Sequence, residues 1–386
     1  MDARVKPEHD SGRGEARIAM PLVTPLGRKL AARIARFGPM TLADYMAAVL
    51  TDPEHGYYTT RDPLGAAGDF TTAPEISQMF GELVGLWCCD LWQRSGSPSP
   101  VWLAELGPGR GTLIADALRA ARLVPDFLKA ARLALIEVSP SLRARQAETL
   151  AEAAPEVQPL WLDHVGHLPE GPAIVIANEF FDALPVRQFE RGPEGWRERL
   201  VVLDPDSGSL ALAPGPTDPA LAELVPPNLR DASPGTVAEI CPAGLSLAAA
   251  LGARIATDGL GALIVDYGPE VPTGQATVQA LRGHQPVDIL DGPGTADLTA
   301  HVDFSALAET AKGVGASPHG PRSQGDFLEA LGIGARTAAL CRGGDVERRS
   351  LIEAARDRLT DPNGMGRLFK ALAITGSSLD TPAGFA

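Results

Sequence analysis

An acid and three glycines form the stretch of this 386-residue sequence that is best suited to bind a small ligand. Glu105 lies inside a short apolar run, and Gly107, Gly109 and Gly111 follow at alternate positions. Glycines let the backbone pass close to a ligand because they carry no Cβ atom. A strand that leads through such a turn into a helix N-terminus forms a nucleotide cradle. We expect residues 101–113 to bind a cofactor; the alternative is a glycine turn without a ligand.

The spacing of these residues indicates which cofactor. A dinucleotide-binding fingerprint has a third glycine at its sixth position, where this chain has Thr112, and this disfavours a nucleotide-dependent oxidoreductase. The order of acid and glycines instead resembles the first motif of class I S-adenosylmethionine-dependent methyltransferases. S-adenosylmethionine carries an ammonium group, which Glu105 can attract directly or through water. We assign cofactor binding to Glu105, Gly107, Pro108 and Gly109.

Two further acids follow predicted strands of the same sheet. Glu137 lies near the end of the apolar run 133–138, where a carboxylate can bind both ribose hydroxyls of a nucleoside. Asp163 follows the predicted strand 157–162, where an acid can reach the adenine amino group. The alternatives are an exposed strand-end carboxylate for Glu137 and an ordinary loop carboxylate for Asp163.

The predicted strand 173–177 runs into the sequence Asn-Glu-Phe-Phe-Asp-Ala-Leu-Pro, which starts at Asn178. Ligands of open α/β sheets lie outside the carboxyl ends of the strands, so this corner should face the methyl group. The carboxylates of Glu179 and Asp182 can pair with a guanidinium and orient one of its nitrogens. We assign catalysis to Asn178, Glu179 and Asp182, with Asn178 also contacting the cofactor. The alternative is that Asp182 caps the next helix and the phenylalanines belong to the core.

The order of the strands and helices that must position these residues predicts an α/β fold. We expect a mostly parallel Rossmann-like sheet with helices on both faces. The predicted order is strand 101–106, helix 112–122, strand 133–138, helix 140–153, strand 157–162, strand 173–177, helix 243–257, strand 261–266 and a closing strand 365–374. Around this core we expect a disordered tail at 1–19, a helical cap at 20–96, insertions at about 191–235 and 269–297, and a tail at 376–386. The core itself then spans 97–375, and the first insertion is predicted to be a hairpin plus a loop.

Composition excludes several classes of function. The net charge of -14 argues against a nucleic-acid surface, and we expect a basic or neutral partner. The four cysteines lack metal-binding spacing and the seven histidines are scattered, so we predict reduced thiols and no metal. The sequence contains no apolar run of about 18 residues, so we expect no membrane span. Residues 1–19 lack the apolar region of a secretory signal, and Met20 is a second possible start.

Six segments together resemble the MidA-like family, which includes mitochondrial arginine methyltransferases that assist assembly of respiratory complex I. They recur in the family's order and cover roughly residues 25–375: 68–75, 105–111, 178–185, 265–268, 297–303 and 365–370. The first segment adds Thr72, Pro74 and Glu75 to the expected cofactor-binding residues, and Asp69 and Glu75 are second candidates for positioning the acceptor. The insertion at 191–235 is the part that the resemblance does not cover.

The resemblance implies a class I methyltransferase that uses S-adenosyl-L-methionine and dimethylates an arginine symmetrically. The implied partner is a core subunit of complex I, or of the bacterial NADH–quinone oxidoreductase. We expect this bacterial-type chain in the cytoplasm and its eukaryotic relatives in the mitochondrial matrix. Two alternatives stay open, a cofactor-binding assembly factor without catalysis and a methyltransferase that acts on a small molecule. The sequence gives no oligomeric state.

Overall fold

A seven-stranded, mainly parallel sheet forms the centre of the larger lobe in the computed structural model, which describes residues 24–60 and 72–386. Its strand order is β14-β15-β10-β5-β2-β3-β4. The strands are β2 (Val101–Leu106), β3 (Ala131–Ile136), β4 (Leu160–Leu162), β5 (Ala173–Asn178), β10 (Leu260–Tyr267), β14 (Ser317–Ser323) and β15 (Phe369–Thr375). Strand β15 runs antiparallel to both of its neighbours, β10 and β14, and the remaining neighbouring pairs of this sheet are parallel. The predicted Rossmann-like α/β fold is therefore confirmed.

The chain reverses its direction of travel across this sheet between β2 and β5. From β2 it proceeds to β3 and β4 on one side, and it then returns to place β5 and β10 on the other. Such a switch leaves a crevice at the carboxyl ends of the two central strands, which is where open α/β sheets bind ligands. The glycine turn follows β2 and the 178–182 corner follows β5, so both lie at this crevice.

Helices cover both faces of the sheet, because successive side chains of a buried strand point to opposite faces. In β15, Ala371 and Ala373 pack with one hydrophobic cluster, whereas Leu372 and Ile374 pack with the other. The first cluster is covered mainly by α5 (Gln78–Arg94), α6 (Thr112–Ala121), α12 (Gln324–Ala330) and α13 (Ile333–Cys341). The second is covered by α10 (Pro242–Asp258) and α11 (Phe304–Gly313). The short α7 (Pro125–Ala130) and the longer α8 (Pro140–Ala153) complete the crossovers beside β3.

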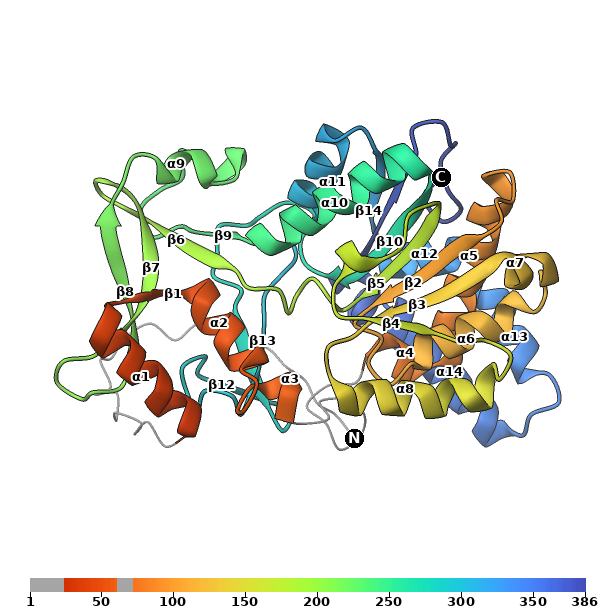
Figure 1. Cartoon of the computed structure of the whole chain (residues 1–386), viewed down its shortest axis with the longest axis horizontal. Helices are drawn as coiled ribbons and strands as arrows, with labels where there is room; N and C mark the ends of the chain where they lie inside the picture. Colours follow the sequence, from red (N-terminus) through yellow and green to blue (C-terminus); the bar gives the residue numbers. More distant parts are fainter. Residues whose placement is uncertain (1–23, 61–71) are drawn as a thin grey trace.

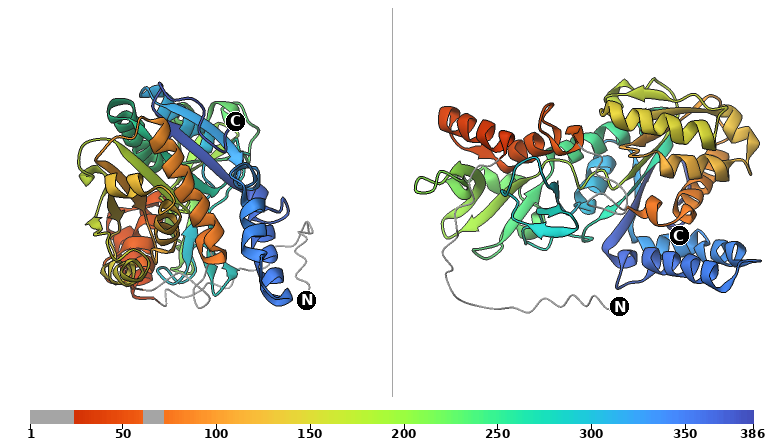
Figure 2. Two further views of the ribbon diagram at one scale, coloured as in Figure 1. Left: turned by 90° about the vertical axis from the view of Figure 1, so that its right-hand side faces the viewer. Right: turned by 90° about the horizontal axis from the view of Figure 1, so that it is seen from below.

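The second lobe holds two smaller sheets and lies beside the core in two views (Figures 1 and 2). Its five-stranded sheet contains β1 (Met40–Thr41), β6 (Arg187–Gly192), β7 (Gly195–Leu203), β8 (Leu210–Thr217) and β9 (Val237–Ile240). Its three-stranded sheet contains β11 (Gln279–Arg282), β12 (Gln285–Val287) and β13 (Asp297–Thr299). Helices α1 (Pro25–Phe37), α2 (Leu42–Thr51) and α3 (Tyr57–Thr60) belong to this lobe, and α9 (Leu221–Leu224) packs on β7.

The predicted hairpin of the first insertion is part of a larger sheet. Strands β7 and β8 pair antiparallel as a hairpin and also join β1, β6 and β9. The reason is that β1, from the N-terminal segment, pairs with β7 through Met40 and Thr41. This contact spans about 160 residues and leaves no local pattern in the sequence.

The segment 20–96, predicted as one helical cap, divides between the two lobes among its described residues. Helices α1 and α2 pack into the cluster of the second lobe, whereas α5 packs along α6 in the core. Trp87 and Trp92 are buried in that core cluster. The core therefore begins before residue 97, because the apolar face of α5 finds its partner on the central sheet.

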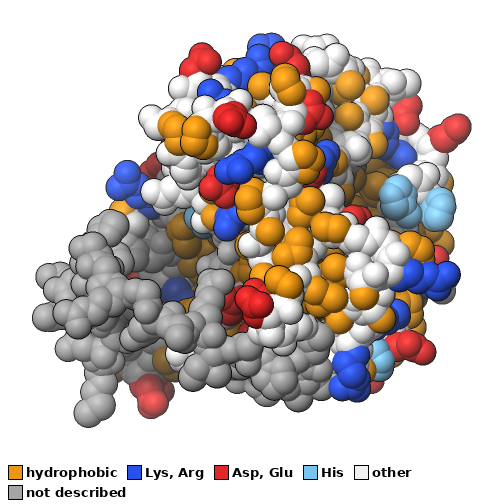
Figure 3. All heavy atoms as spheres, turned by 90° about the vertical axis from the view of Figure 1, so that its left-hand side faces the viewer, with side chains coloured by type: hydrophobic (Ala, Val, Ile, Leu, Met, Phe, Trp, Pro, Cys, Tyr) orange, Lys and Arg blue, Asp and Glu red, His pale blue; other side chains and the backbone are white. Residues whose placement is uncertain are grey.

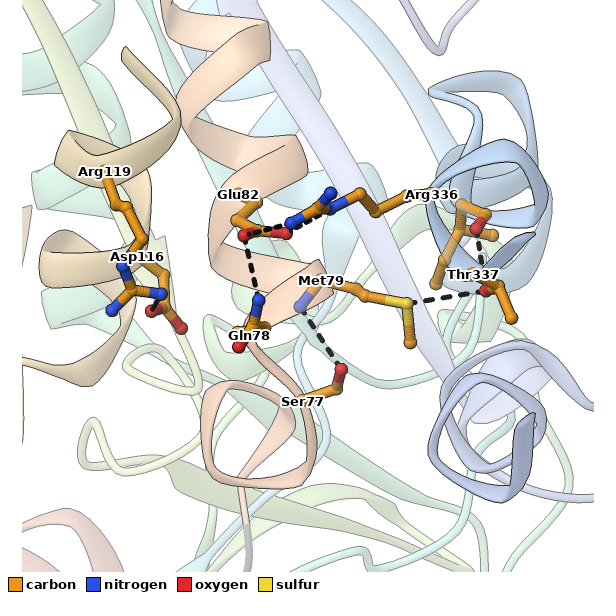
Figure 4. Close-up of polar contacts among 9 residues, drawn as sticks. Ser77, Gln78, Met79, Glu82, Asp116, Arg119, Arg336 and Thr337 are labelled. Carbon is orange, nitrogen blue, oxygen red and sulfur yellow. Dashed lines mark hydrogen bonds and ion pairs between the residues drawn. The ribbon is translucent and has the colours of Figure 1, made fainter. Parts of the chain in front are cut away.

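Helices near the C-terminus attach to the core through a partly buried ion pair (Figure 4). Arg336 of α13 donates from Nε and Nη2 to the two carboxylate oxygens of Glu82 on α5, at 2.7 and 2.8 Å. Thr337 contacts Met79 beside this pair, and Gln78 donates to Glu82 at 3.1 Å. Helix α14 (Val346–Thr360) follows and packs on α13.

The end of the chain differs from the prediction in two respects. The predicted closing strand 365–374 begins only at Phe369, because Met365–Leu368 forms the short helix α15. The segment 376–386, predicted as a tail, packs on the core: Trp87 donates to the Ala383 carbonyl at 3.1 Å, and Phe385 packs against Phe327. Apolar residues in that segment find a surface that only the folded chain provides.

Candidate active site

The glycine turn between β2 and α6 has the backbone conformation that its sequence predicts. Gly107, Gly109 and Gly111 have φ values of +60, +54 and +79°, which favour glycine. A Cβ atom on Gly107 would also lie 2.8 Å from Cδ2 of Phe180. The turn therefore needs glycine at 107 both for its conformation and for its close approach to the 178–182 corner.

A small cavity of about 70 Å³ lies beside this turn and is lined by most of the expected cofactor-binding residues. Two acceptors that line it are buried without a hydrogen-bond partner among the described residues, Glu105 Oε2 and Asn178 Oδ1. Burial raises the pKa of Glu105 to about 8, against the opposing effect of a hydrogen bond from the Ile114 N–H. Unpaired buried acceptors are costly, so this pair marks a place that fits a donor-rich ligand.

The segment 72–76 closes this small cavity from the other side. Thr72 precedes the short helix α4 (Ala73–Ile76), and Pro74 and Glu75 lie in its first turn. Glu75 Oε1 accepts a hydrogen bond of 2.6 Å from the Thr112 hydroxyl at the start of α6. Thr72, Pro74 and Glu75 therefore meet the glycine turn in space, as expected from the first of the six family segments.

Glu137, expected to bind a ribose, is buried just beyond β3. Its Oε1 accepts from the Ser139 N–H at 2.8 Å and its Oε2 from Gln146 Nε2 at 3.2 Å. Burial raises its pKa, while these two hydrogen bonds act in the opposite direction. Gln146 of α8 also donates to the Gly109 carbonyl at 2.8 Å and accepts from Trp161 Nε1 at 2.9 Å. One buried amide thus joins the glycine turn to the ribose carboxylate.

Asp163, expected near an adenine, is an exposed loop carboxylate that lines the larger of two cavities. Its Oδ1 lies 2.5 Å from Arg143 Nη2, and Arg143 also donates to the Glu137 carbonyl. Asp163 is thus a loop carboxylate that lines the cavity, and its contact with an adenine stays a prediction.

The 178–182 corner is a tight turn that a buried carboxylate holds in place. Asp266, at the end of β10, accepts from the Phe181 and Asp182 N–H groups at 2.9 and 3.2 Å through Oδ2. Glu179 has a φ of +49°, a conformation uncommon for a residue with a side chain. Phe181 is in the core and Phe180 packs against it, whereas Asp182 is not a helix cap: no helix follows it, and it is buried at the larger cavity.

Glu179 connects this corner to the segment at 72–76. Its Oε1 accepts from the Ala73 N–H at 3.0 Å and lies 3.4 Å from Asn178 Nδ2. Its Oε2 has no hydrogen-bond partner among the described residues. Burial raises the pKa of Glu179 to about 7, and burial together with the charge of Glu179 also raises the pKa of Asp182. Both carboxyl groups are therefore poised to change charge near neutral pH.

A second cavity of about 800 Å³ opens from the same place. Thr72, Gly107, Gly109 and Glu179 line both cavities. Five carboxylates line the large cavity, from Glu137, Asp163, Glu179, Asp182 and Asp297. Among the described lining residues, Arg358 of α14 is the one Lys or Arg. A cavity with this charge balance favours a cationic guest.

These observations test the fit of the expected cofactor, S-adenosyl-L-methionine. The orphan acceptors of Glu105 and Asn178 suit its ammonium group, and the approach of Gly107 to Phe180 leaves a cradle that a Cβ would fill. Glu137 and Asp163 line the large cavity on the side of β3 and β4, where a nucleoside would lie. The residues present therefore fit the cofactor.

Several residues of the site escaped sequence reasoning. Gln146 and Asp266 act through hydrogen bonds across the fold. No local pattern points to Gln146, whereas Asp266 lies in the family segment 265–268. Tyr58 and Asp297 line the large cavity from the second lobe; Asp297 begins one of the six family segments, which was the available signal. Asp69, a second candidate for positioning the acceptor, lies outside the described residues, as do the segment 1–19 and Met20.

Other expectations concern metals, membranes and surface charge. Across residues 24–60 and 72–386, no group of three or more His, Cys, Asp or Glu side chains could hold a metal ion. Within the same part of the chain, no helix is long and apolar enough to cross a membrane. All four cysteines are free, as expected. On the described surface in Figure 3, Lys and Arg are interspersed with acids and do not form a basic patch.

Comparison with protein families places the chain among enzymes of one class. Residues 83–322 match a family described as "Putative S-adenosyl-L-methionine-dependent methyltransferase". The protein arginine methyltransferase NDUFAF7 of Mus musculus mitochondria is 41% identical over 379 residues, which cover 91% of this chain and 84% of the mouse protein. The Drosophila melanogaster homologue is 38% identical and covers 90% of this chain and 84% of its own.

Solved structures show the same relationship. A methyltransferase-type protein of Burkholderia thailandensis, crystallised with S-adenosyl-homocysteine, superposes with a TM-score of 0.82 at 31% identity, and the match covers 93% of both chains. A second crystal structure from that organism superposes with a TM-score of 0.80 over the same shares. The likeness therefore extends over both lobes and not only over the central sheet.

Proposed function

This chain belongs to the family of S-adenosyl-L-methionine-dependent methyltransferases, and from that premise we propose that it methylates the guanidinium group of arginine residues in a protein. The observation that carries the proposal is the junction of the two cavities at Glu179. The small cavity suits the methionine end of the cofactor, and the described lining of the large one combines five carboxylates with a single guanidinium. A cationic acceptor would thus reach the reacting methyl group beside Glu179.

The cofactor supplies a methyl group on a sulfonium centre; transfer breaks the S–CH₃ bond, forms an N–CH₃ bond and leaves a neutral thioether. Glu105 and Asn178 would accept hydrogen bonds from the ammonium group, and Glu137 from the ribose hydroxyls. Glycines 107 and 109 let the backbone approach. These residues fix the direction in which the methyl group points, and placement of this kind supplies much of the rate.

Glu179 would bind the acceptor guanidinium. Its Oε1 is held by the Ala73 N–H, so the carboxylate is oriented before the substrate arrives, and Oε2 faces no partner among the described residues. The guanidinium loses one proton during or after attack, and a carboxylate whose pKa lies near 7 can receive it. Asp182, on the same cavity wall, would add the second negative charge.

We propose further that the acceptor arginine lies in a subunit of respiratory complex I, or of the bacterial NADH–quinone oxidoreductase, and that it is dimethylated symmetrically. The family resemblance of the six sequence segments supports this, as does the similarity to the mitochondrial arginine methyltransferases. For this chain we propose the cytoplasm, where the four free cysteines would stay reduced.

Labelling of a cell extract tests the proposed function. The purified chain is incubated with methyl-labelled S-adenosyl-L-methionine and extract, and the labelled proteins are hydrolysed to amino acids. We expect labelled methylarginine, including the symmetric dimethyl form, in the size range of a complex I subunit. Label in lysine, or only in small molecules, would contradict the arginine assignment. A Glu179→Gln variant serves as the control, since it should bind the cofactor and transfer little label.

A further inference from the structure

One end of the large cavity is built by the second lobe, away from the glycine turn. Tyr58 of α3, Gln279 of β11, and Asp297 and Thr299 of β13 line it there. Tyr267, at the end of β10, lines the same end from the core. The cofactor-binding residues proposed above all come from the core sheet and from the segment 72–76, so these second-lobe residues belong to the acceptor side of the large cavity.

Hydrogen bonds join these residues across the two lobes. The Tyr58 hydroxyl donates to Asp297 Oδ1 at 2.8 Å, which links positions 239 residues apart. The Tyr267 hydroxyl donates to the Thr299 hydroxyl and accepts from Gln279 Nε2 at 3.4 Å. The Ala300 N–H donates to the Asp182 carbonyl at 2.9 Å, so the strand that carries Asp297 is fixed directly to the catalytic corner.

The carboxylates at this end are buried, yet they line a cavity. Asp182 is 7% exposed and Asp297 is 5% exposed. Arg358, the one Lys or Arg among the described lining residues, lies on an exposed turn of α14. Buried carboxylates in a cavity of about 800 Å³ favour a guest that brings positive charge and several donors. Glu179 lines both cavities, so a guest that contacts Glu179 from the large cavity would lie next to the cofactor region.

We propose that Asp182 and Asp297, with the hydroxyls of Tyr58 and Tyr267, form a subsite that selects a guanidinium over an ammonium group. This inference rests on the proposed arginine methylation and names the residues that would give it specificity. A guanidinium offers five donors in a planar fork, whereas an ammonium is a compact point charge. Acceptors on two carboxylates from different lobes, together with Glu179, would match the fork and leave an ammonium under-coordinated.

The subsite makes α3 and β13 specificity-determining elements. Both belong to parts of the chain added around the methyltransferase core. The segment that follows β13 bonds to Asp182 and Tyr267 of the core, and α3 joins β13 through the bond from Tyr58 to Asp297. The core would therefore bind the cofactor, while the second lobe would recognise the acceptor.

Fragment binding tests this assignment without knowledge of the natural substrate. The probes are ethylguanidinium and propylammonium, titrated calorimetrically into the full chain saturated with S-adenosyl-homocysteine. We expect ethylguanidinium to bind the unmodified protein at least fivefold more tightly than propylammonium. Asp297→Asn should weaken ethylguanidinium binding at least tenfold, and Tyr58→Phe threefold or more, while the affinity for S-adenosyl-homocysteine changes less than twofold.

The matched control is Asp291→Asn, in the same insertion. Asp291 pairs with Arg282 at 3.1 Å and does not line the cavity, so this variant should bind ethylguanidinium like the unmodified protein. Thermal melting identifies variants that fail to fold, and Tyr58→Phe, which removes one oxygen, then carries the test. Unchanged ethylguanidinium affinity in Asp297→Asn and Tyr58→Phe, equal affinity for the two probes, or no binding of ethylguanidinium would overturn the subsite.

Failure of the proposed function would look different. If extract labelling yields methylarginine but the two variants bind ethylguanidinium normally, the subsite is wrong and arginine methylation stands. If the labelling yields no methylarginine but Asp297→Asn loses ethylguanidinium binding, the subsite stands and the proposed substrate is wrong.

Discussion

The carboxylate of Glu179 accepts a hydrogen bond from the backbone N–H of Ala73 at 3.0 Å, across 106 residues of sequence. This bond joins the segment that closes the small cavity to the corner that follows β5. Glu179 is held at a φ of +49°, and strained backbone of this kind persists only where surrounding contacts impose it. The bond therefore orients the residue at which both cavities meet.

Replacement of Glu179 by Gln should separate binding from transfer. The amide keeps an acceptor for the Ala73 N–H but loses the charge that pairs with a guanidinium. We expect the transfer rate to fall by about 10²-fold or more, as for loss of a positioned general base. The affinity for S-adenosyl-L-methionine should stay within about threefold. Single-turnover transfer and calorimetry measure the two quantities, and a rate near that of the unmodified protein would remove Glu179 from the mechanism.

The same residue should give the reaction a pH dependence. Only the ionised form of Glu179 attracts the guanidinium, and burial raises its pKa to about 7. The transfer rate should therefore rise with pH through about 7 and level off above it. Rates measured from pH 5.5 to 8.5 at saturating cofactor test this. A profile that is flat from pH 6 to 8 would show that the charge on Glu179 does not limit transfer.

Glu179 should also make stability pH-dependent in the cofactor-free protein. Its folded pKa is raised above the unfolded value, so the folded state binds the proton more tightly between about pH 4.5 and 7. Its contribution to the free energy of unfolding is present below about pH 4.5 and is lost as the pH rises towards 7. Melting should therefore show Glu179→Gln gaining stability relative to the unmodified protein from pH 5 to pH 8. A difference that stays constant with pH would contradict this.

Replacement of the Glu105 carboxyl group should weaken binding of the cofactor. Its orphan Oε2 lines the small cavity, and a hydrogen bond to a charged group contributes about 1.5–3 kcal/mol. We expect Glu105→Gln to raise the dissociation constant of S-adenosyl-L-methionine by about 10- to 100-fold. The melting temperature without cofactor should not fall, since the variant removes a buried carboxylate without a second partner. Calorimetry and melting provide both readings, and unchanged affinity would argue against contact with the ammonium group.

Gln146 should act as a positioning residue for the cofactor. It donates to the Gly109 carbonyl and to Glu137, so its loss would free the glycine turn and the ribose carboxylate together. Gln146→Met should raise the KM for S-adenosyl-L-methionine by about tenfold, the cost of roughly 1.4 kcal/mol, with kcat within about threefold. Glu148→Met, an exposed change on the same helix, is the control. Equal effects on kcat and KM would indicate a general structural role.

The ion pair between Glu82 and Arg336 should stabilise the attachment of the C-terminal helices. Nε and Nη2 of Arg336 both donate to the Glu82 carboxylate. That carboxylate is buried, whereas the Arg336 side chain is 37% exposed. Arg336→Met should lower the free energy of unfolding by about 1–3 kcal/mol, less than for a fully buried pair because solvent screens the guanidinium. Arg119→Met is the comparison, because Arg119 pairs with Asp116 only three residues away. We expect a loss below about 1 kcal/mol there, and equal losses would contradict the argument.

The sequence by itself predicted the central sheet apart from β14, and most of the residues that line the small cavity. Gly107, Gly109 and Glu105 are encoded by local spacing, and the strand before them is bounded where its apolar run ends. Glu137 and Asp163 follow from the same logic, since acids after parallel strands meet at one edge of the sheet. These features are local, and local residue types suffice to predict them.

Only the tertiary structure decided how the acceptor side is built. Tyr58, Asp182 and Asp297 come together because α3 and β13 fold against the end of the core sheet. Likewise, the assignment of α5 to the core and the docking of 376–386 depend on apolar surfaces that exist only once the sheet has formed. Burial and hydrogen bonding between residues hundreds of positions apart leave no periodic trace in the chain. The glycines and acids proposed to bind the cofactor could therefore be predicted from their spacing, whereas the subsite proposed to recognise the substrate required the folded molecule.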